Sequence, residues 1–246
     1  MLELNKIHLG DCYELIKQIP DNSVDCIYTD VPYLFKNQTR KGGGVLSEKA
    51  NVGMEELRFI SDGFEDSVLE DFVRISKKTN IFIWCNKFQF KKMLEFIFEK
   101  GFKFELLVWH KTNPLPMTSN IWLSDLEYCF WIAEYGVNLN DGYLLKSKAF
   151  SSGINQHDKS LYDHPSIKPI ELVKRHLLHA TQPNDIVLDC FSGSGTTCVA
   201  AKELGRHFIG IEIDEKYHKI SVDRLNGICA NGQTSIFTDF LGGTTE

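Results

Sequence analysis

The stretch Ile186-Val-Leu-Asp-Cys-Phe-Ser-Gly-Ser-Gly-Thr-Thr197 decides the fold class. It has the pattern of a short apolar strand, a glycine-rich turn and the start of a helix, an arrangement that binds nucleotide-type cofactors in parallel α/β sheets. Gly193 and Gly195 let the backbone approach a ligand where a Cβ would clash. The next apolar run ends at Glu212, 19 residues after Gly193, where a carboxylate can accept hydrogen bonds from two ribose hydroxyls. The pattern predicts a cofactor that contains adenosine, bound across the strand ends.

The residues around the turn favour one cofactor over others. A dinucleotide-binding turn has a third glycine that packs helix against strand, and Cys198 occupies that position here. Asp189, just before the turn, would repel a pyrophosphate but can bind a cationic amine. S-adenosylmethionine has such an amine and no phosphate. Two alternatives to S-adenosylmethionine binding remain: a nicotinamide-dependent oxidoreductase on a similar fold, and a tight turn that binds no ligand.

Strand and helix patterns alternate along the rest of the chain. Alternation of this kind predicts a doubly wound, Rossmann-like α/β fold with a mostly parallel sheet and helices on both faces. Strands are expected at 24–29, 80–84, 106–109, 127–132, 186–188 and 207–211, and helices at 67–78, 87–100, 169–180, 195–204 and 214–228. Residues 34–64 contain three consecutive glycines and little periodicity, which predicts a mobile loop. Residues 230–246 have the composition of a flexible tail, so a single domain is expected over 1–229.

Composition limits the function classes. The chain of 246 residues has no apolar run of membrane-spanning length and no signal-peptide pattern at its start, so a cytoplasmic protein is expected. The net charge of −6 is unlike that of a typical nucleic-acid binder, but residues 74–111 contain nine Lys/Arg against three acids. The seven cysteines include no Cys-x-x-Cys and the histidines have no ligand spacing, which favours reduced core thiols and no metal site.

A second motif, Thr29-Asp30-Val31-Pro32-Tyr33, ends the first strand pattern. An exocyclic amine on a nucleobase is a poor nucleophile, because its lone pair is delocalised into the ring. Acceptors that hold both amine hydrogens draw the nitrogen toward sp³ geometry, and the Asp30 carboxylate with the Val31 carbonyl could supply them. Pro32 restricts Val31 to extended geometry, and Tyr33 offers a flat face for an extruded base.

At these residues the sequence resembles the amino-DNA methyltransferases, a family with an Asp-Pro-Pro-Tyr catalytic motif. The catalytic tetrapeptide here precedes the cofactor loop, a permuted order that resembles the β class. Three further pieces match the same family: Gly10-Asp11-Cys12, Trp109-His-Lys-Thr-Asn-Pro114 and His164-Pro-Ser-Ile-Lys-Pro169. The likeness covers about residues 5–226. It implies the S-adenosylmethionine-dependent methyltransferase fold with a seven-stranded sheet, and it makes 112–163 the candidate target-recognition insertion.

The resemblance also implies residue roles. The catalytic pocket would consist of Asp30, Val31, Pro32 and Tyr33, with Val31 in place of the family's first proline. The cofactor would be bound by Asp11, Cys12, His164, Ser166, Lys168, Asp189, Phe191, Ser192, Gly193, Ser194, Gly195, Thr196 and Glu212. Within this set Asp11 would contact the adenine, Glu212 the ribose, and Lys168 the methionyl end.

The implied substrate is double-stranded DNA, with the target nucleotide flipped out of the duplex. Adenine N6 is favoured over cytosine N4, because family members that act on cytosine more often carry serine where Asp30 stands. A catalytically weak DNA-binding protein on the same fold is a further alternative. The resemblance suggests a bacterial or phage protein that forms homodimers and shares its site with a cognate restriction endonuclease. Candidate DNA contacts are Lys36, Arg40, Lys41, Lys87, Lys91, Lys111 and Asn113.

Overall fold

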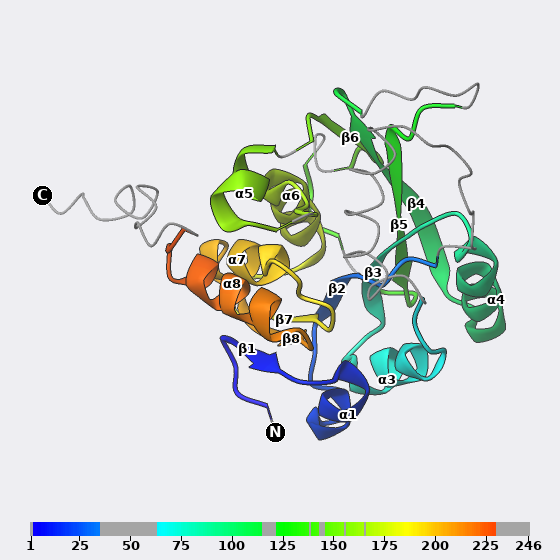
Figure 1. The fold of residues 1–246 in the computed structure, drawn as a ribbon. Coiled ribbons are helices and arrows are strands. Elements are labelled where there is room, and N and C mark those ends of the chain that lie inside the picture. The colour runs from blue at the N-terminus through cyan, green and yellow to red at the C-terminus, as the bar shows by residue number, and fades with distance from the viewer. Residues whose placement is uncertain are drawn as a thin grey trace, which may run out of the picture.

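The computed structural model describes residues 2–34, 63–114, 122–137, 139–142, 146–154, 156–164 and 166–229. In this part of the chain eight strands form one sheet in the order β1-β8-β7-β2-β3-β5-β4-β6 (Figure 1). The strands are β1 (Lys6–Leu9), β2 (Cys26–Asp30), β3 (Asn80–Cys85), β4 (Lys103–Lys111), β5 (Leu126–Ala133), β6 (Ala149–Ser152), β7 (Ile186–Asp189) and β8 (His207–Glu212). The helices are α1 (Cys12–Leu15), the 3₁₀ helix η1 (Ile16–Gln18), α3 (Ser67–Ile75), α4 (Phe90–Lys100), α5 (Gln156–Tyr162), α6 (Ile170–Ala180), α7 (Thr196–Glu203) and α8 (Glu215–Leu225).

The sheet is parallel except around β5, which runs antiparallel to both β3 and β4. The mostly parallel architecture is therefore confirmed, but the count of seven strands is wrong for the described residues, which form eight. Two strands were not expected from periodicity: β1 and β6, each of four residues. β6 is polar (AFSS) and half-exposed, and its parallel pairing with β4 determines its conformation.

Both faces of the sheet are covered, as the doubly wound fold requires. All six residues of β3 are buried, because alternate side chains point into two separate cores. Ile81 and Ile83 pack in the core that α3 and α4 cover, whereas Phe82 and Trp84 pack in the core that α6 and α7 cover. Figure 1 shows these helix pairs on opposite sides of the central strands.

Helix ends follow local chemistry. α4 ends at Gly101, which has φ 69°, and Asp214 caps α8 by accepting a hydrogen bond from the Tyr217 amide at 3.0 Å, both as expected. α3 is shorter than predicted, because Ser76 leaves the helix to pair with Val24. α5 lies within residues 112–163, the candidate target-recognition insertion, where the sequence pattern predicted no helix.

All seven cysteines are buried and free. No helix in the described ranges is both long enough and apolar enough to span a bilayer. Within the same ranges, no three His, Cys, Asp or Glu side chains are grouped so that they could hold a metal ion. Residues 35–62, which form most of the predicted loop, and the predicted tail 230–246 lie outside the described residues.

Candidate active site

The two sequence motifs lie side by side at one edge of the sheet. β2 ends at Asp30 and β7 ends at Asp189, and these strands are parallel neighbours. The Thr29 hydroxyl donates a hydrogen bond of 2.9 Å to Asp189 Oδ1, which links residues 160 positions apart. Ligands in open α/β sheets bind outside the carboxyl ends of the strands, so this edge is the candidate active site.

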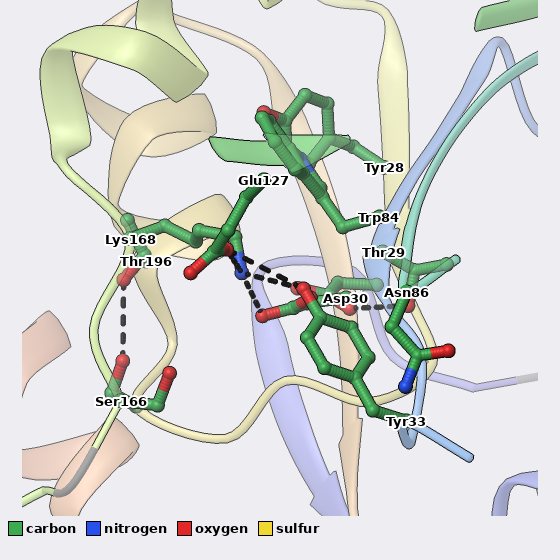
Figure 2. A network of polar contacts seen from close by, with 12 residues as sticks. Tyr28, Thr29, Asp30, Tyr33, Trp84, Asn86, Glu127, Ser166, Lys168 and Thr196 are labelled. Atoms are coloured by element: carbon green, nitrogen blue, oxygen red, sulfur yellow. Dashed lines mark hydrogen bonds and ion pairs between the residues drawn. The ribbon is translucent and has the colours of Figure 1, made fainter. Parts of the chain in front are cut away.

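Asp30 has one occupied and one unoccupied carboxylate oxygen. Its Oδ2 forms an ion pair with the Lys168 ammonium (Figure 2). Its Oδ1 is buried and has no hydrogen-bond partner within the described part of the chain. Burial raises the pKa of Asp30 and the Lys168 charge opposes that rise, with the balance above the usual value. A buried acceptor without a donor is costly, so it marks a place where a ligand can donate.

Lys168 lies between two carboxylates. Besides Asp30 it contacts Glu127 Oε2 at 3.0 Å, and the other Glu127 oxygen pairs with Lys111 at 2.6 Å. Lys168 also donates to the Tyr33 hydroxyl at 3.4 Å (Figure 2). Burial alone would lower the pKa of Lys168, but Asp30 and Glu127 raise it above its ordinary value. The structure thus places the Lys168 ammonium at the Asp30 carboxylate, although the sequence resemblance assigned this residue to the cofactor.

The tetrapeptide backbone is held by the turn that precedes α4. Gln89 Nε2 donates to the Pro32 carbonyl at 2.8 Å, and Asn86 Nδ2 donates to the Leu34 carbonyl at 2.7 Å. The Val31 side chain is only 1% exposed and packs in the α3/α4 core. These contacts restrain a segment that lacks the family's first proline. Neither amide was singled out in the sequence, because an Asn-x-x-Gln spacing in a loop has no distinctive pattern.

The glycine-rich loop is organised by backbone amides that point at carboxylates. Asp189 Oδ1 also accepts from the Phe191 amide at 3.2 Å, and Glu212 accepts from the Gly193 amide at 2.7 Å. Burial raises the pKa of Asp189 to about 6, against hydrogen bonds from Thr197 and Thr29. Burial also raises the pKa of Glu212 above its ordinary value. The Ser192 hydroxyl donates to the Asp189 carbonyl at 3.0 Å, which closes the turn.

Gly195 shows why the loop needs glycine. Its φ is 74°, and an added Cβ would lie 2.9 Å from the Ser221 Cβ on α8. Arg224 of α8, a buried side chain, contacts the residues on either side of Gly195. Arg224 Nη1 donates to the Ser194 carbonyl and hydroxyl at 3.2 Å and to the Thr196 hydroxyl at 2.7 Å. Sequence reasoning missed Arg224, although a lone arginine on the sheet-facing side of a helix is a signal of buried polar contacts.

The remaining predicted cofactor residues surround the same edge. Asp11 caps α1 through the Tyr13 amide at 2.9 Å, directly after β1, and Cys12 beside it is buried. The His164 ring packs against the Tyr217 ring with centroids 4.5 Å apart and the ring planes tilted by 57°, and the Ser166 amide donates to His164 Nδ1 at 3.2 Å. Burial lowers the pKa of His164 to about 4, so its ring is neutral at physiological pH.

The residues predicted to contact DNA fall into three groups: some lie outside the described residues, some lie near the start of α4, and some contact the protein itself. Lys36, Arg40 and Lys41 lie outside the described residues. Lys87 lies in the turn between β3 and α4, and Lys91 lies in the first turn of α4, where it pairs with Glu95 at 3.5 Å. Lys111 is 17% exposed and engaged with Glu127, and Asn113 accepts from the Ile154 amide at 2.5 Å, so both contact the protein itself. Six of the nine basic residues in 74–111 form ion pairs: Arg74, Lys77, Lys91, Lys92, Lys100 and Lys111.

Comparison with known proteins decides the family. A family model described as DNA methylase matches residues 24–223, most of the chain and both motifs. The chain belongs to the DNA methylase family. It is 33% identical over 245 residues to the type II methyltransferase M2.LlaDCHI of Lactococcus lactis subsp. cremoris, covering 88% of this chain and 87% of that protein. This family assignment excludes the alternative that the chain is a nicotinamide-dependent oxidoreductase.

Solved structures agree with the family. The crystal structure of the M1.HpyAVI–SAM complex aligns with a TM-score of 0.67 and 26% identity, covering 89% of this chain and 98% of that one. The PvuII DNA methyltransferase, described as cytosine-N4-specific, aligns with a TM-score of 0.68 over 89% of this chain and 85% of that one. Its identity is 19%, so that likeness shows the fold alone. The fold is that of the S-adenosylmethionine-dependent methyltransferases, and S-adenosylmethionine is the cofactor.

The residues at the strand ends fit this cofactor. Two buried carboxylates, Asp189 and Glu212, suit a ligand with a cationic amine and two ribose hydroxyls, and no basic side chain contacts either of them in the described residues. His164 Nε2 is buried without a partner in the described chain, 3.4 Å from the point where a Gly193 Cβ would lie. A side chain at 193 would therefore occupy space between the loop and an unsatisfied polar atom. When bound, S-adenosylmethionine supplies an electrophilic methyl group.

Proposed function

We propose that this chain methylates the N6 amine of adenine in double-stranded DNA, with the target nucleotide flipped out of the duplex. The observation that carries the proposal is the buried Oδ1 of Asp30, which has no hydrogen-bond partner among the described residues and lies at the strand end next to Asp189. An amine hydrogen donated to Oδ1 would remove the cost of leaving that oxygen unsatisfied. The Val31 carbonyl is the second acceptor, and together they orient the nitrogen lone pair.

The other residues at the edge define what the pocket accepts. Tyr33 gives an aromatic face against which an extruded base stacks. The Lys168 charge lowers the pKa of Asp30 against the rise that burial causes, and so favours the ionised carboxylate, which is an acceptor. Asp30 therefore positions the amine more than it removes a proton. Flipping the nucleotide costs a few kcal/mol, which contacts in the pocket must offset.

Cytosine N4 is the second candidate, because the same two acceptors suit any exocyclic amine. The Asp30 carboxylate in place of serine favours adenine. The deciding experiment measures modified nucleosides by mass spectrometry in DNA from cells that have no other DNA methylation and that express the chain. N6-methyladenine is expected, and the Asp30→Ala chain serves as the inactive control. N4-methylcytosine as the sole product would refute the adenine assignment.

The proposed roles of the surrounding residues follow their positions. Asp189, Glu212, Asp11 and His164 would bind the cofactor together with the loop residues Phe191–Thr196. Lys87 and Lys91 are the described candidates for phosphate contacts, because α4 begins at the strand-end edge that contains Asp30. The type II description of the relative supports a role beside a cognate restriction endonuclease. A homodimer is part of the same proposal.

A further inference from the structure

A chain of four charged side chains connects β4 with the catalytic carboxylate. The order of contacts is Lys111, Glu127, Lys168 and Asp30, so charges alternate along it. We propose that Glu127 is a positioning residue, which holds the Lys168 ammonium beside Asp30 and offsets its positive charge toward the target amine. The inference rests on the proposed function, because it assumes that Asp30 receives that amine.

Glu127 contacts Lys168 from a strand of the sheet. Glu127 lies near the start of β5, opposite Trp109 of β4. Its side chain is 18% exposed, and both of its oxygens are occupied by ammonium groups. Lys168 has 8% exposure and lies in the segment before α6, so β5 supplies a fixed partner for a flexible side chain. The Lys168 ammonium also lies 5.2 Å from the Trp84 ring centroid, which limits its movement further.

Charge balance explains why a second carboxylate is needed. When an amine nitrogen is alkylated it gains positive charge, and a lone ammonium beside its acceptor would oppose that change. Two carboxylates and two ammonium groups give the cluster no net charge. Glu127 therefore allows the Lys168 ammonium to lie beside Asp30 without leaving excess positive charge at the pocket.

Glu127 has the electrostatic properties of a permanent anion. Burial would raise its pKa, but Lys168 and Lys111 lower it to about 2, so Glu127 stays charged over the working pH range. Asp30 is the member of the cluster whose charge responds to its neighbours: Lys168 lowers its pKa and Glu127 raises it. The other titratable groups that face the cluster are Tyr28, Tyr33, Cys85, Cys129, Lys159 and Asp189.

The test compares the titration of Asp30 in two variants that change opposite charges. Glu127→Gln should lower the pKa of Asp30 by about one unit, because a neighbouring anion is lost, and Lys168→Met should raise it by at least as much. The ¹³C-labelled carboxyl of Asp30, assigned with Asp30→Asn, reports this pKa even in inactive protein. In variants that remain active, the acid limb of the plot of kcat against pH should move to lower pH in Glu127→Gln and to higher pH in Lys168→Met. An Asp30 pKa that is the same in the wild type and in both variants would overturn the proposal.

The kinetic readout separates positioning from a general loss of structure. Glu127→Gln should lower kcat by about tenfold, less than the roughly 100- to 1,000-fold typical for a group that contacts the reacting atoms. Cofactor affinity should stay within about twofold, because Glu127 does not contact the cofactor loop. Glu105→Gln is the matched control: Glu105 is on neighbouring β4 and pairs with Lys148 near the surface, so its loss should leave kcat unchanged.

Glu127→Gln removes the carboxylate that pairs with Lys111, and the unpaired buried ammonium could prevent folding. A second variant avoids this problem. The double variant Lys111→Met/Glu127→Gln removes one charge of each sign, and it should still lower the pKa of Asp30. Normal kcat and an unshifted Asp30 in either variant, together with inactive Asp30→Asn, would remove Glu127 from the mechanism and leave the proposed function intact. Active Asp30→Asn would instead refute the proposed function.

Discussion

Two aspartates end neighbouring strands of the same sheet, yet their surroundings differ. Asp189 at the end of β7 accepts hydrogen bonds from neutral donors, the Thr29 hydroxyl and the Phe191 amide. Asp30 at the end of β2 is paired with a buried ammonium through one oxygen, and its other oxygen has no partner in the described chain. Among the described residues, Asp189 has neutral hydrogen-bond donors but no cation, whereas Asp30 has a cation but no donor for its Oδ1.

The difference indicates what each carboxylate still requires. A buried anion without a countercharge gains most from a cationic ligand, such as the amine of the methionyl group. A carboxylate that already has a countercharge gains most from a neutral hydrogen-bond donor, such as the exocyclic amine of a base. One strand end thus suits the cofactor and its neighbour suits the substrate.

The largest expected effect is at Asp30. Asp30→Asn keeps the shape of the side chain but removes its charge, so methyl transfer should fall by at least about 1,000-fold while cofactor affinity stays within about threefold. Single-turnover transfer of labelled methyl and calorimetry with S-adenosylhomocysteine measure the two quantities. Asp25→Asn is the matched control, since Asp25 precedes the same strand at the opposite edge, where it pairs with Lys77. Equal losses in both variants would contradict a special role for Asp30.

The stability of the cofactor-free protein should depend on Asp189. Burial raises the pKa of Asp189 to about 6 from an ordinary 3.8, so the folded state binds this proton more tightly than the unfolded state. The free energy of unfolding should therefore decrease as pH rises through 4 to 6, by up to about 3 kcal/mol. Urea unfolding of the wild type and Asp189→Asn across this range measures the difference. A constant difference between the two proteins would show that Asp189 has an ordinary pKa.

The same substitution should weaken cofactor binding. Loss of one charge-assisted hydrogen bond costs about 1.5–3 kcal/mol, so the Kd for S-adenosylhomocysteine should rise roughly 10- to 100-fold in Asp189→Asn. Methyl transfer at saturating cofactor should fall much less than in Asp30→Asn. An unchanged Kd would mean that the cationic amine binds elsewhere, and the contrast between the two strand ends would then disappear.

The smallest effect on cofactor binding is expected at Arg224, which contacts the glycine-rich loop. Arg224→Lys keeps the positive charge but loses the planar group that contacts Ser194 and Thr196 together, so the Kd for the cofactor should rise by only a few-fold. Transfer at saturating cofactor should remain near normal, which steady-state kinetics at several cofactor concentrations will show. A large loss of kcat without a change in Kd would place Arg224 in the substrate half of the site.

The sequence predicted the features that depend on local pattern. Alternating apolar runs located the central strands, and the glycine turn and the Asp30 tetrapeptide each identified a strand end. Parallel strands have their carboxyl ends at one edge, so the two motifs could be expected to share that edge once β2 and β7 were neighbours. Short elements such as β6 and α5 had too few residues to show a period.

The charged cluster could not be predicted, because it depends on partners far apart in the chain. Glu127 belongs to a strand that runs antiparallel to β3, and it lies 41 positions before Lys168 in the sequence. Counting charges in 74–111 suggested a surface for phosphates, yet most of those side chains form ion pairs within the protein. Charge counts reveal how many basic groups a segment has but not which acids they face.

The most direct test of the account is a crystal structure with S-adenosylhomocysteine and a duplex that contains the methylated sequence. The account predicts a flipped adenine whose N6 lies about 3 Å from Asp30 Oδ1, with the cofactor between Asp189 and Glu212. A target base still stacked in the duplex, or a protein donor bound to Asp30 Oδ1 in place of the amine, would contradict it.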